Sequence, residues 1–306
     1  MDKPKGPDAV MRRKYWQLAR KSVDEFFEDS PFQLAAALSF YTVLSLSPLV
    51  LIVVAAAGLV WGEQPVRSEL LNQIRELTGD AGAETVRTVL ESTTISGKSI
   101  GSMILGIVTL LFGATTVFAQ LQSSLNQIWD VKTAVKTVTR RGLLWSLIRT
   151  RLLSLTLVLA VGFLLLVSLV VSAALAAFQA YLSRAFPGGG TLWQILNFLV
   201  SLLVISVLIA MVYRVLPDVR LDWPDVWVGA ITTSLLFGVG KFLIGLYLGR
   251  ASIGSSYGAA GSLVVFLVWV YYSSLIMFFG AEITFVYAQD RRKRVRPTEL
   301  AVVADR

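Results

Sequence analysis

Two charged residues lie inside stretches that are otherwise apolar, and they are the residues of this sequence best placed to do chemistry. Lys241 lies in the run from Val226 to Leu248, and Glu282 lies in the run from Ser262 to Ala288. An ionised group inside a hydrocarbon layer costs about 2.5 to 3.5 kcal/mol on insertion scales, so each requires a partner or a purpose. In membrane proteins such groups bind ions or anionic substrates, carry protons, or form internal ion pairs.

Lys241 shares a helical face with two glycines, since Gly245 and Gly249 follow it at four-residue intervals. Small residues on that face favour close contact with another helix, so we expect Lys241 to face protein or a cavity. We hypothesise that its ammonium meets an aromatic ring of the last apolar run through cation–π or hydroxyl contacts. The alternative is a lysine that extends to the outer lipid headgroups. The candidate rings are Trp269, Tyr271 and Tyr272.

Glu282 lies in Gly280-Ala281-Glu282, six residues before the end of its apolar run and too deep to pair with Lys241. One interpretation is a structural ion pair or hydrogen bond, and the candidate partners are Arg214, Ser39 and Tyr41. The other is proton coupling in a transporter.

Further polar and small residues fall at helical spacing in other apolar runs. Gly106, Gly113 and Gln120 lie on one face, which must turn away from lipid and therefore packs tightly against a helix or lines a polar path. Asn197 and Ser201 share a face in a later run. Pro48 lies near the middle of the first run, where loss of one backbone donor predicts a kink.

The elements that position these residues must be membrane-spanning helices. The chain has 306 residues, is 55% hydrophobic and has a mean hydropathy of +0.67, which is too apolar for a water-soluble globule. A helix needs roughly 20 apolar residues to cross the bilayer, and we predict an all-α, polytopic fold with six transmembrane helices. The runs are Leu34 to Trp61, Ile100 to Phe118, Leu152 to Leu182, Leu192 to Tyr213, Val226 to Leu248 and Ser262 to Ala288.

Basic residues predict the topology. Most of the 28 Lys and Arg residues fall in the segments that are cytoplasmic if the N-terminus is inside, so both termini are expected in the cytoplasm. The net charge of +8 then faces anionic lipid headgroups, and we expect membrane lipids rather than nucleic acid as partners, with a homo-oligomer as a possibility.

A single membrane domain is expected over 1–290, followed by a basic cytoplasmic tail over 291–306. Within it, 1–13 is expected to be a disordered tail. Apolar residues at helical spacing predict an amphipathic interfacial helix over 15–27, and the alternative is a soluble cytoplasmic helix. Two apolar stripes within 63–99, separated by a turn at Gly79 to Gly82, predict two short amphipathic helices that cap the outer face.

The composition argues against several kinds of chemistry. The chain has no cysteine and no histidine, which removes thiolate chemistry together with the commonest metal ligand and general base. Phosphate-binding, dinucleotide and zinc signatures are missing, so we expect no enzymatic activity, cofactor or metal. Three aspartates, Asp218, Asp222 and Asp225, could in principle hold Mg²⁺, although aspartates in a turn are usually solvated.

Four stretches together carry a family resemblance. They are AAALSFYTVLSLSPL, LQSSLNQIWDV, RVLPDVRLDWPDVWVGA and YGAAGSLVVFLVWVYYSSLIMFFGAEI, and their order and spacing cover about residues 20 to 290. The chain resembles the YihY/BrkB family of bacterial inner-membrane proteins. The resemblance implies six helical spans and a label as a virulence or serum-resistance factor, with ribonuclease BN as an older label. It also implies links to envelope integrity and to export of lipid or lipopolysaccharide precursors.

Three functions follow from these observations. The first is a translocator or exporter of an amphiphilic or anionic substrate, such as a lipid or envelope precursor, which the internal cation and polar helix faces favour. The second is a non-transporting envelope scaffold, in which polar faces hold helices together. The third and least favoured is a ribonuclease, because the catalytic residue types and a cytoplasmic catalytic domain are missing.

Overall fold

The computed structural model describes residues 7–92, 116–133, 190–250, 260–292, 296–297 and 301–303. Long helices make up most of this part of the chain, in agreement with the predicted helical fold. They are α1 (Pro7–Glu28), α2 (Pro31–Trp61), α3 (Glu63–Thr78), α4 (Asp80–Ser92), α7 (Gly190–Val215), α8 (Trp223–Arg250) and α10 (Gly261–Arg292), together with a helical segment over 116–128.

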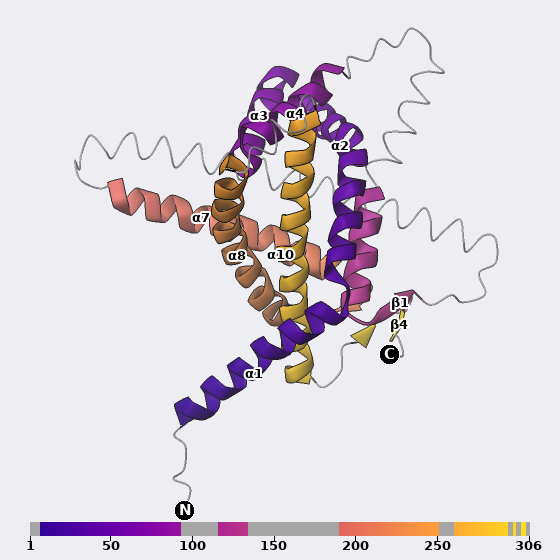
Figure 1. The fold of residues 1–306 in the computed structure, drawn as a ribbon, viewed down its shortest axis with the longest axis vertical. Coiled ribbons are helices and arrows are strands. Elements are labelled where there is room, and N and C mark those ends of the chain that lie inside the picture. The colour runs from indigo at the N-terminus through magenta and orange to yellow at the C-terminus, as the bar shows by residue number, and fades with distance from the viewer. Residues whose placement is uncertain are drawn as a thin grey trace, which may run out of the picture.

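Helix α10 is the centre of the bundle. It is apolar along most of its length, with Glu282 as an internal charge and a charged end at Asp290 and Arg291, and it packs against α8, α2, α1 and α4. Figure 1 shows α8 on one side of α10 and α2 on the other. Helix α7 packs on α8, and the end of α7 reaches α10 through Tyr213. The last apolar run of the sequence therefore forms the helix that the other helices surround.

Three helices are long and apolar enough to cross a membrane within the described residues. The spanning stretches are Phe198–Val215, Trp223–Ile244 and Gly261–Arg291, and they coincide with the fourth, fifth and sixth predicted runs. Helix α2 covers the first predicted run, and its described apolar stretch is the shorter Pro31–Ser47. The second and third runs lie almost entirely outside the described residues, so the count of six spans stays a prediction.

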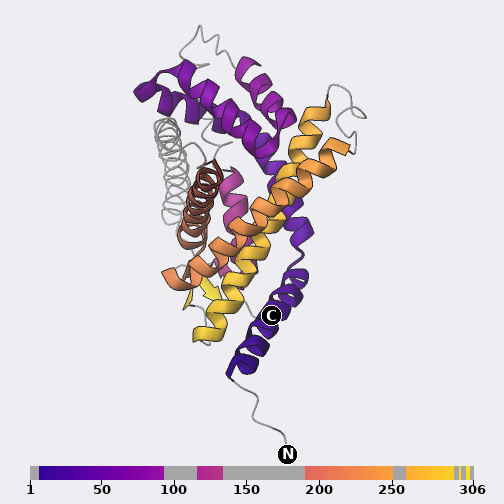
Figure 2. The same ribbon diagram turned by 90° about the vertical axis from the view of Figure 1, so that its left-hand side faces the viewer.

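Helices α3 and α4 cover one end of the bundle, which we call the cap end (Figure 2). They confirm the two predicted amphipathic helices, and Gly79, at φ 80°, makes the turn between them. The turn is shorter than predicted, because α4 already begins at Asp80. Apolar side chains from four helices form a core beneath this cap: Leu46, Val50 and Val54 of α2, Val66 of α3, Val86 and Leu90 of α4, and Phe266 and Val270 of α10.

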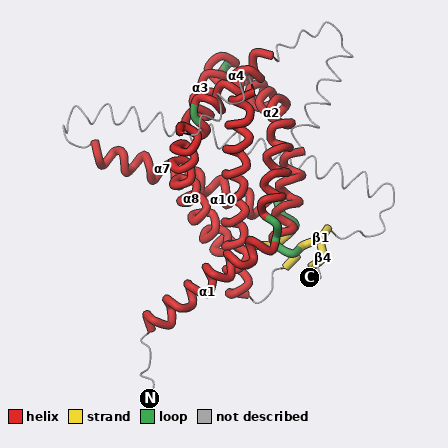
Figure 3. Tube along the Cα trace, in the orientation of Figure 1, coloured by secondary structure: helices red, strands yellow, loops and turns green. Residues whose placement is uncertain are grey.

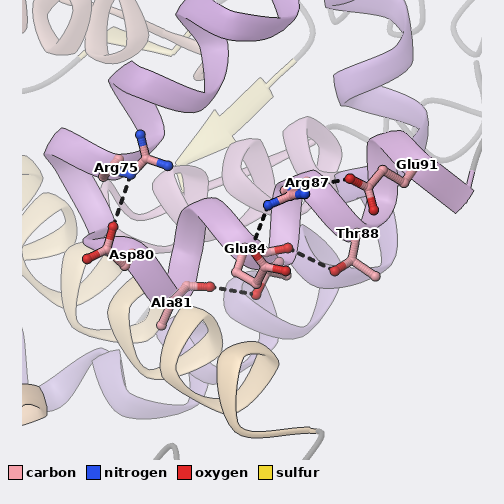
Figure 4. A network of polar contacts seen from close by, with 8 residues as sticks. Arg75, Asp80, Ala81, Glu84, Arg87, Thr88 and Glu91 are labelled. Atoms are coloured by element: carbon pink, nitrogen blue, oxygen red, sulfur yellow. Dashed lines mark hydrogen bonds and ion pairs between the residues drawn. The ribbon is translucent and has the colours of Figure 1, made fainter.

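Ion pairs cover the solvent side of the cap helices (Figure 4). Arg75 Nε lies 3.0 Å from Asp80 Oδ1, and Arg87 Nε lies 2.8 Å from Glu91 Oε1. The hydrogen bond from Arg87 to Glu91, together with the charges of Glu91 and Glu84, raises the pKa of Arg87, which is charged at any physiological pH. Because these groups are exposed, the pairs contribute little to the stability of the cap.

The opposite end, which we call the tail end, holds α1 and four short strands. Strand β1 (Val131–Thr133) pairs with β4 (Ala301–Val303), and β2 (Val219–Arg220) pairs with β3 (Arg296–Pro297), both antiparallel. Helices, strands and connecting loops are distinguished by colour in Figure 3. The C-terminal tail is therefore tied to two loops of the bundle. These strands have two or three residues each, so the predicted all-helical class stands. The sequence did not indicate them, because their partners lie far away in the sequence.

The N-terminal segment is more ordered than predicted. Helix α1 begins at Pro7, so residues 7–13 are helical rather than part of a disordered tail. Proline is well tolerated in the first turn of a helix because its missing N–H has no partner there. The predicted helix over 15–27 is confirmed as the remainder of α1, and its last turn packs on α10 through Phe26 and Phe279.

Candidate functional site at the tail end of the bundle

Polar side chains from six elements gather among apolar residues near the tail end, and we call this group the tail-end polar cluster. It lies in and beside a core that contains Leu38, Leu125, Phe278 and Phe285. The cluster comprises Asn126 and Trp129 of the 116–128 helix and the turn after it, Tyr213 of α7, Asp218 of the loop after α7, Asp225 and Thr233 of α8, and Glu282 and Arg291 of α10.

Glu282 is the fully buried carboxylate of this cluster, with no exposed surface. Its neighbours along α10, Ala281 and Phe285, are also buried, and the carboxylate takes part in a polar or electrostatic interaction. A carboxylate in such surroundings is retained at a considerable desolvation cost. Among the described residues, Glu282 and Asp225 are the charged residues with at most 1% exposure.

The three residues predicted as partners of Glu282 also make other contacts. The Arg214 guanidinium lies 5.4 Å from the centre of the Trp223 ring, because the loop after α7 brings that ring back over the end of the helix. Ser39 donates to the carbonyl of Ala36 at 2.9 Å within its own helix. Tyr41 contacts the ring of Phe40. Their pairing with Glu282 stays a prediction.

Trp129 and Tyr213 bind the backbone of α10 one turn apart. Trp129 Nε1 donates to the carbonyl of Ala281 at 3.0 Å, and the Tyr213 hydroxyl donates to the carbonyl of Met277. The two rings meet edge to face at 6.1 Å between centroids, and both residues are at most 1% exposed. Neither aromatic residue was singled out as a site residue. The available signal was their amphipathic chemistry, since a buried indole or phenol needs a polar partner.

Asn126 holds the loop between α7 and α8. Its amide oxygen accepts from the backbone N–H of Asp218 at 2.9 Å, and its amide nitrogen donates to the Asp218 carboxylate at 3.0 Å. The paired bonds fix both the backbone and the side chain of the loop against the 116–128 helix. Gln122 adds a longer contact to the same carboxylate at 3.5 Å.

Asp225 and Arg291 join the first turn of α8 to the last turn of α10. Arg291 Nη1 lies 2.8 Å from Asp225 Oδ1, and the Asp225 side chain is 1% exposed while that of Arg291 is half exposed. A carboxylate in a first turn also interacts favourably with the helix dipole. Of the aspartates considered for Mg²⁺, Asp218 accepts a hydrogen bond from Asn126 and Asp225 pairs with Arg291. Within the described residues no group of three metal-ligating side chains is found.

Replacing Arg291 by glutamine is expected to destabilise the protein by about 1–2 kcal/mol, because it removes the charge that faces a buried carboxylate. The matched control is Lys14→Gln, which breaks the exposed pair of Lys14 with Asp290 and should cost less than about 1 kcal/mol. Thermal unfolding of the two variants in the same detergent compares these costs. Equal losses would contradict a special role for the Asp225 pair.

Helices α8 and α10 approach each other at two glycines. A Cβ placed on Gly229 would lie 1.7 Å from Thr284 Oγ1 and 2.7 Å from the carbonyl oxygen of Gly280. A Cβ on Gly280 would lie 1.7 Å from Thr233 Oγ1 and 2.8 Å from the Tyr213 hydroxyl. Each helix therefore contributes a glycine and, four residues later, a threonine that packs on the glycine of the other helix. We call this contact the glycine–threonine lock.

The structure does not bring Lys241 to the predicted rings. Its side chain is exposed on α8 beside Phe242 and Leu243, and among the described residues it forms no cation–π contact or hydrogen bond. Trp269 instead packs edge to face on Phe237 at 5.9 Å, and the Tyr272 ring covers Gly240. Lys241 lies on the face of α8 that these aromatic contacts do not cover.

The remaining predicted site residues have varied positions. Gln120 lies in the 116–128 helix and donates to Ser124 Oγ at 3.3 Å. Tyr271 packs against the core that surrounds the polar cluster. Pro48 lies inside α2, Asn197 inside α7, and Gly245 and Gly249 inside α8, while Gly106 and Gly113 lie outside the described residues.

Several long apolar helices around a buried polar cluster define a multi-pass α-helical membrane protein. The family described as virulence factor BrkB matches residues 22–303, and the chain belongs to this family.

Its relatives include membrane proteins of several bacteria. A UPF0761 membrane protein of Pseudomonas aeruginosa is 27% identical over 94% of this chain and 66% of its own length. One of Rhodospirillum centenum is 25% identical over 91% of this chain and 57% of its own length. One of Alteromonas mediterranea is 27% identical over 84% of this chain and 83% of its own length. The chain spans about two thirds of the length of the first of these relatives. No solved structure matches it significantly.

Proposed function

We propose that this protein is a translocator of an amphiphilic, anionic substrate such as a lipid or envelope precursor. In this proposal it lies in the bacterial inner membrane, with the tail end in the cytoplasm. The observation that carries the proposal is Glu282, a fully buried carboxylate within an apolar helix. An ionisable group at that depth can exchange a proton or bind a cation during a transport cycle, which repays the cost of keeping it there.

Lys241 supports an anionic substrate. It is an exposed cation on α8, and the large side chains around it, Phe242, Leu243 and Tyr247, are exposed apolar groups that suit contact with acyl chains. A lysine among exposed apolar side chains attracts anionic headgroups while its methylene stem stays in the apolar layer. The exposed apolar side chains and the Lys241 cation together favour an amphiphilic substrate over a small soluble ion.

A non-transporting envelope scaffold is the second candidate. The glycine–threonine lock and the bonds from Trp129 and Tyr213 to the α10 backbone favour it, because they hold α7, α8 and the end of the 116–128 helix against α10. A scaffold needs helices held in fixed contact and no conformational change, and a rigid bundle of this kind meets that need. The two functions differ in whether a substrate crosses the membrane.

Reconstitution into liposomes tests the proposal. The probes are fluorescent phosphatidylglycerol, which is anionic, and fluorescent phosphatidylcholine, which is zwitterionic, with dithionite added outside to bleach the exposed leaflet. We expect the wild-type protein to expose inner-leaflet phosphatidylglycerol to the bleach, and we expect Glu282→Gln to slow this movement at least about tenfold.

Glu84→Gln is the control, because Glu84 is an exposed residue of the cap and its loss should not change the rate. Each variant is first compared with the wild type by thermal unfolding. Wild-type protein that is folded but moves neither probe would contradict translocation of lipid and favour the scaffold. Equal movement with Glu282→Gln would remove Glu282 from the mechanism.

A further inference from the structure

Helix α1 has one face that the bundle covers. The Phe26 ring packs edge to face on Phe279 at 5.3 Å, and Ser22 is 2% exposed. Lys14 forms an ion pair with Asp290 at 2.7 Å, and Lys21 donates to Gln289 at 3.1 Å. These contacts run along about the last four turns of α10, so α1 is docked on the protein rather than loosely attached.

The other face of α1 carries large apolar side chains that nothing in the described structure covers. Trp16 is 72% exposed, Val23 is 40% exposed and Phe27 is 59% exposed. Their spacing of seven and then four residues places them within one narrow stripe of the helix. Phe32, at the start of α2, extends the stripe, since it contacts the Phe27 ring at 6.1 Å and is half exposed. We call these four residues the α1 stripe.

Basic residues lie along one edge of this stripe. Arg13 and Arg20 are exposed, seven residues apart and adjacent to Trp16 and Val23 on the helix surface. Among the described residues, Arg20 forms a single ion pair, a long and exposed contact of 3.8 Å with Asp24, so its guanidinium can bind other anions. In contrast, Lys14 and Lys21 point to the covered face, where α10 supplies their partners.

The corner between α1 and α2 sets the direction of the stripe. Ser30 adopts a left-handed conformation with φ 54° and ψ 50°, so the chain turns sharply instead of continuing as one helix. Figure 1 shows the result, in which α1 leaves the tail end of the bundle obliquely while α2 rises beside α10. The N-terminal part of α1 thereby extends away from the long helices.

We propose that α1 is a docking surface for anionic phospholipid headgroups in the leaflet at the tail end. Trp16, Val23 and Phe27 insert below the headgroups, while Arg13 and Arg20 bind phosphate oxygens. Two observations select lipid as the occupant: the stripe begins at the foot of a membrane-spanning bundle, and its polar edge carries guanidinium groups that match phosphate. This inference is independent of any transport activity.

The absence of cysteine from the sequence makes a site-specific test direct. A spin label is attached to Val23→Cys in the stripe or to Gln17→Cys, which is exposed but lies a quarter turn away from it. Each labelled full-length protein is placed in nanodiscs of phosphatidylglycerol or of phosphatidylcholine alone. Paramagnetic relaxation by oxygen and by a water-soluble nickel chelate then reports whether each label lies in lipid or water.

In phosphatidylglycerol discs we expect the label at Val23 to be reached by the nickel chelate at least about fivefold less than the label at Gln17. The Arg13→Gln, Arg20→Gln double variant should lose most of this protection, as should the phosphatidylcholine discs. Equal nickel access at the two positions in phosphatidylglycerol would overturn the proposal. So would protection that is the same in both lipids, or strong dipolar coupling between labels on two copies of the chain.

Discussion

Gly229→Ala is expected to separate α8 from α10 and to destabilise the protein by at least about 2–3 kcal/mol. The added methyl group would lie 1.7 Å from Thr284 Oγ1 and 2.7 Å from a backbone oxygen of the facing helix. The threonine can rotate but the backbone cannot, so the helices must move apart. Within a bilayer, close packing of small residues supplies much of the attraction between helices, and its loss is not offset by burial elsewhere.

Helix α8 offers a matched control for this change. A Cβ on Gly238 would meet nothing within 4 Å, so Gly238→Ala should leave the unfolding temperature within about 2 °C of wild type. We expect Gly229→Ala to lower it by roughly 5–10 °C in detergent. Adding Thr284→Ala to Gly229→Ala removes the clash with the threonine but leaves the clash with the Gly280 carbonyl oxygen. The double variant should therefore recover only part of the lost stability. Equal stability of the Gly229 and Gly238 variants would show that the lock contributes little.

Trp129→Ala is expected to cost about 3–5 kcal/mol, the usual range for removing a fully buried tryptophan. The side chain is 1% exposed, packs on Tyr213 and donates to the Ala281 carbonyl, so its loss leaves a cavity between three elements. Trp129→Phe keeps most of the packing and loses the hydrogen bond, which predicts a smaller cost of about 1–2 kcal/mol.

Thermal unfolding followed by size-exclusion chromatography measures both changes. Phe242→Ala serves as the control, because Phe242 is a large aromatic side chain on α8 that is 70% exposed. Its replacement is expected to have little effect on stability. If Trp129→Ala is no more harmful than Phe242→Ala, the indole does not hold α10. If Trp129→Phe is as harmful as Trp129→Ala, the hydrogen bond dominates over the packing.

The sequence by itself determined the helical class, the membrane setting and the family. The first two depend on the length of the apolar runs, and the family depends on the order and spacing of characteristic stretches. The runs that contain Lys241 and Glu282 become α8 and α10, and the apolar stripes between residues 63 and 92 become α3 and α4. Hydrocarbon requires every backbone group to be bonded within its own segment, so a long apolar run has few conformations other than a helix.

Side-chain partners were decided by the tertiary structure alone. Glu282 was expected to be internal and is fully buried, whereas Lys241 was expected to face protein or a cavity and is exposed. The contacts that organise the tail end join residues far apart in sequence, as Trp129 does with Ala281 and Asn126 with Asp218. A helical pattern shows which face of a segment is polar, but not which helix that face meets. That choice depends on close fits such as Gly229 against Thr284, which arise when two helices are already side by side.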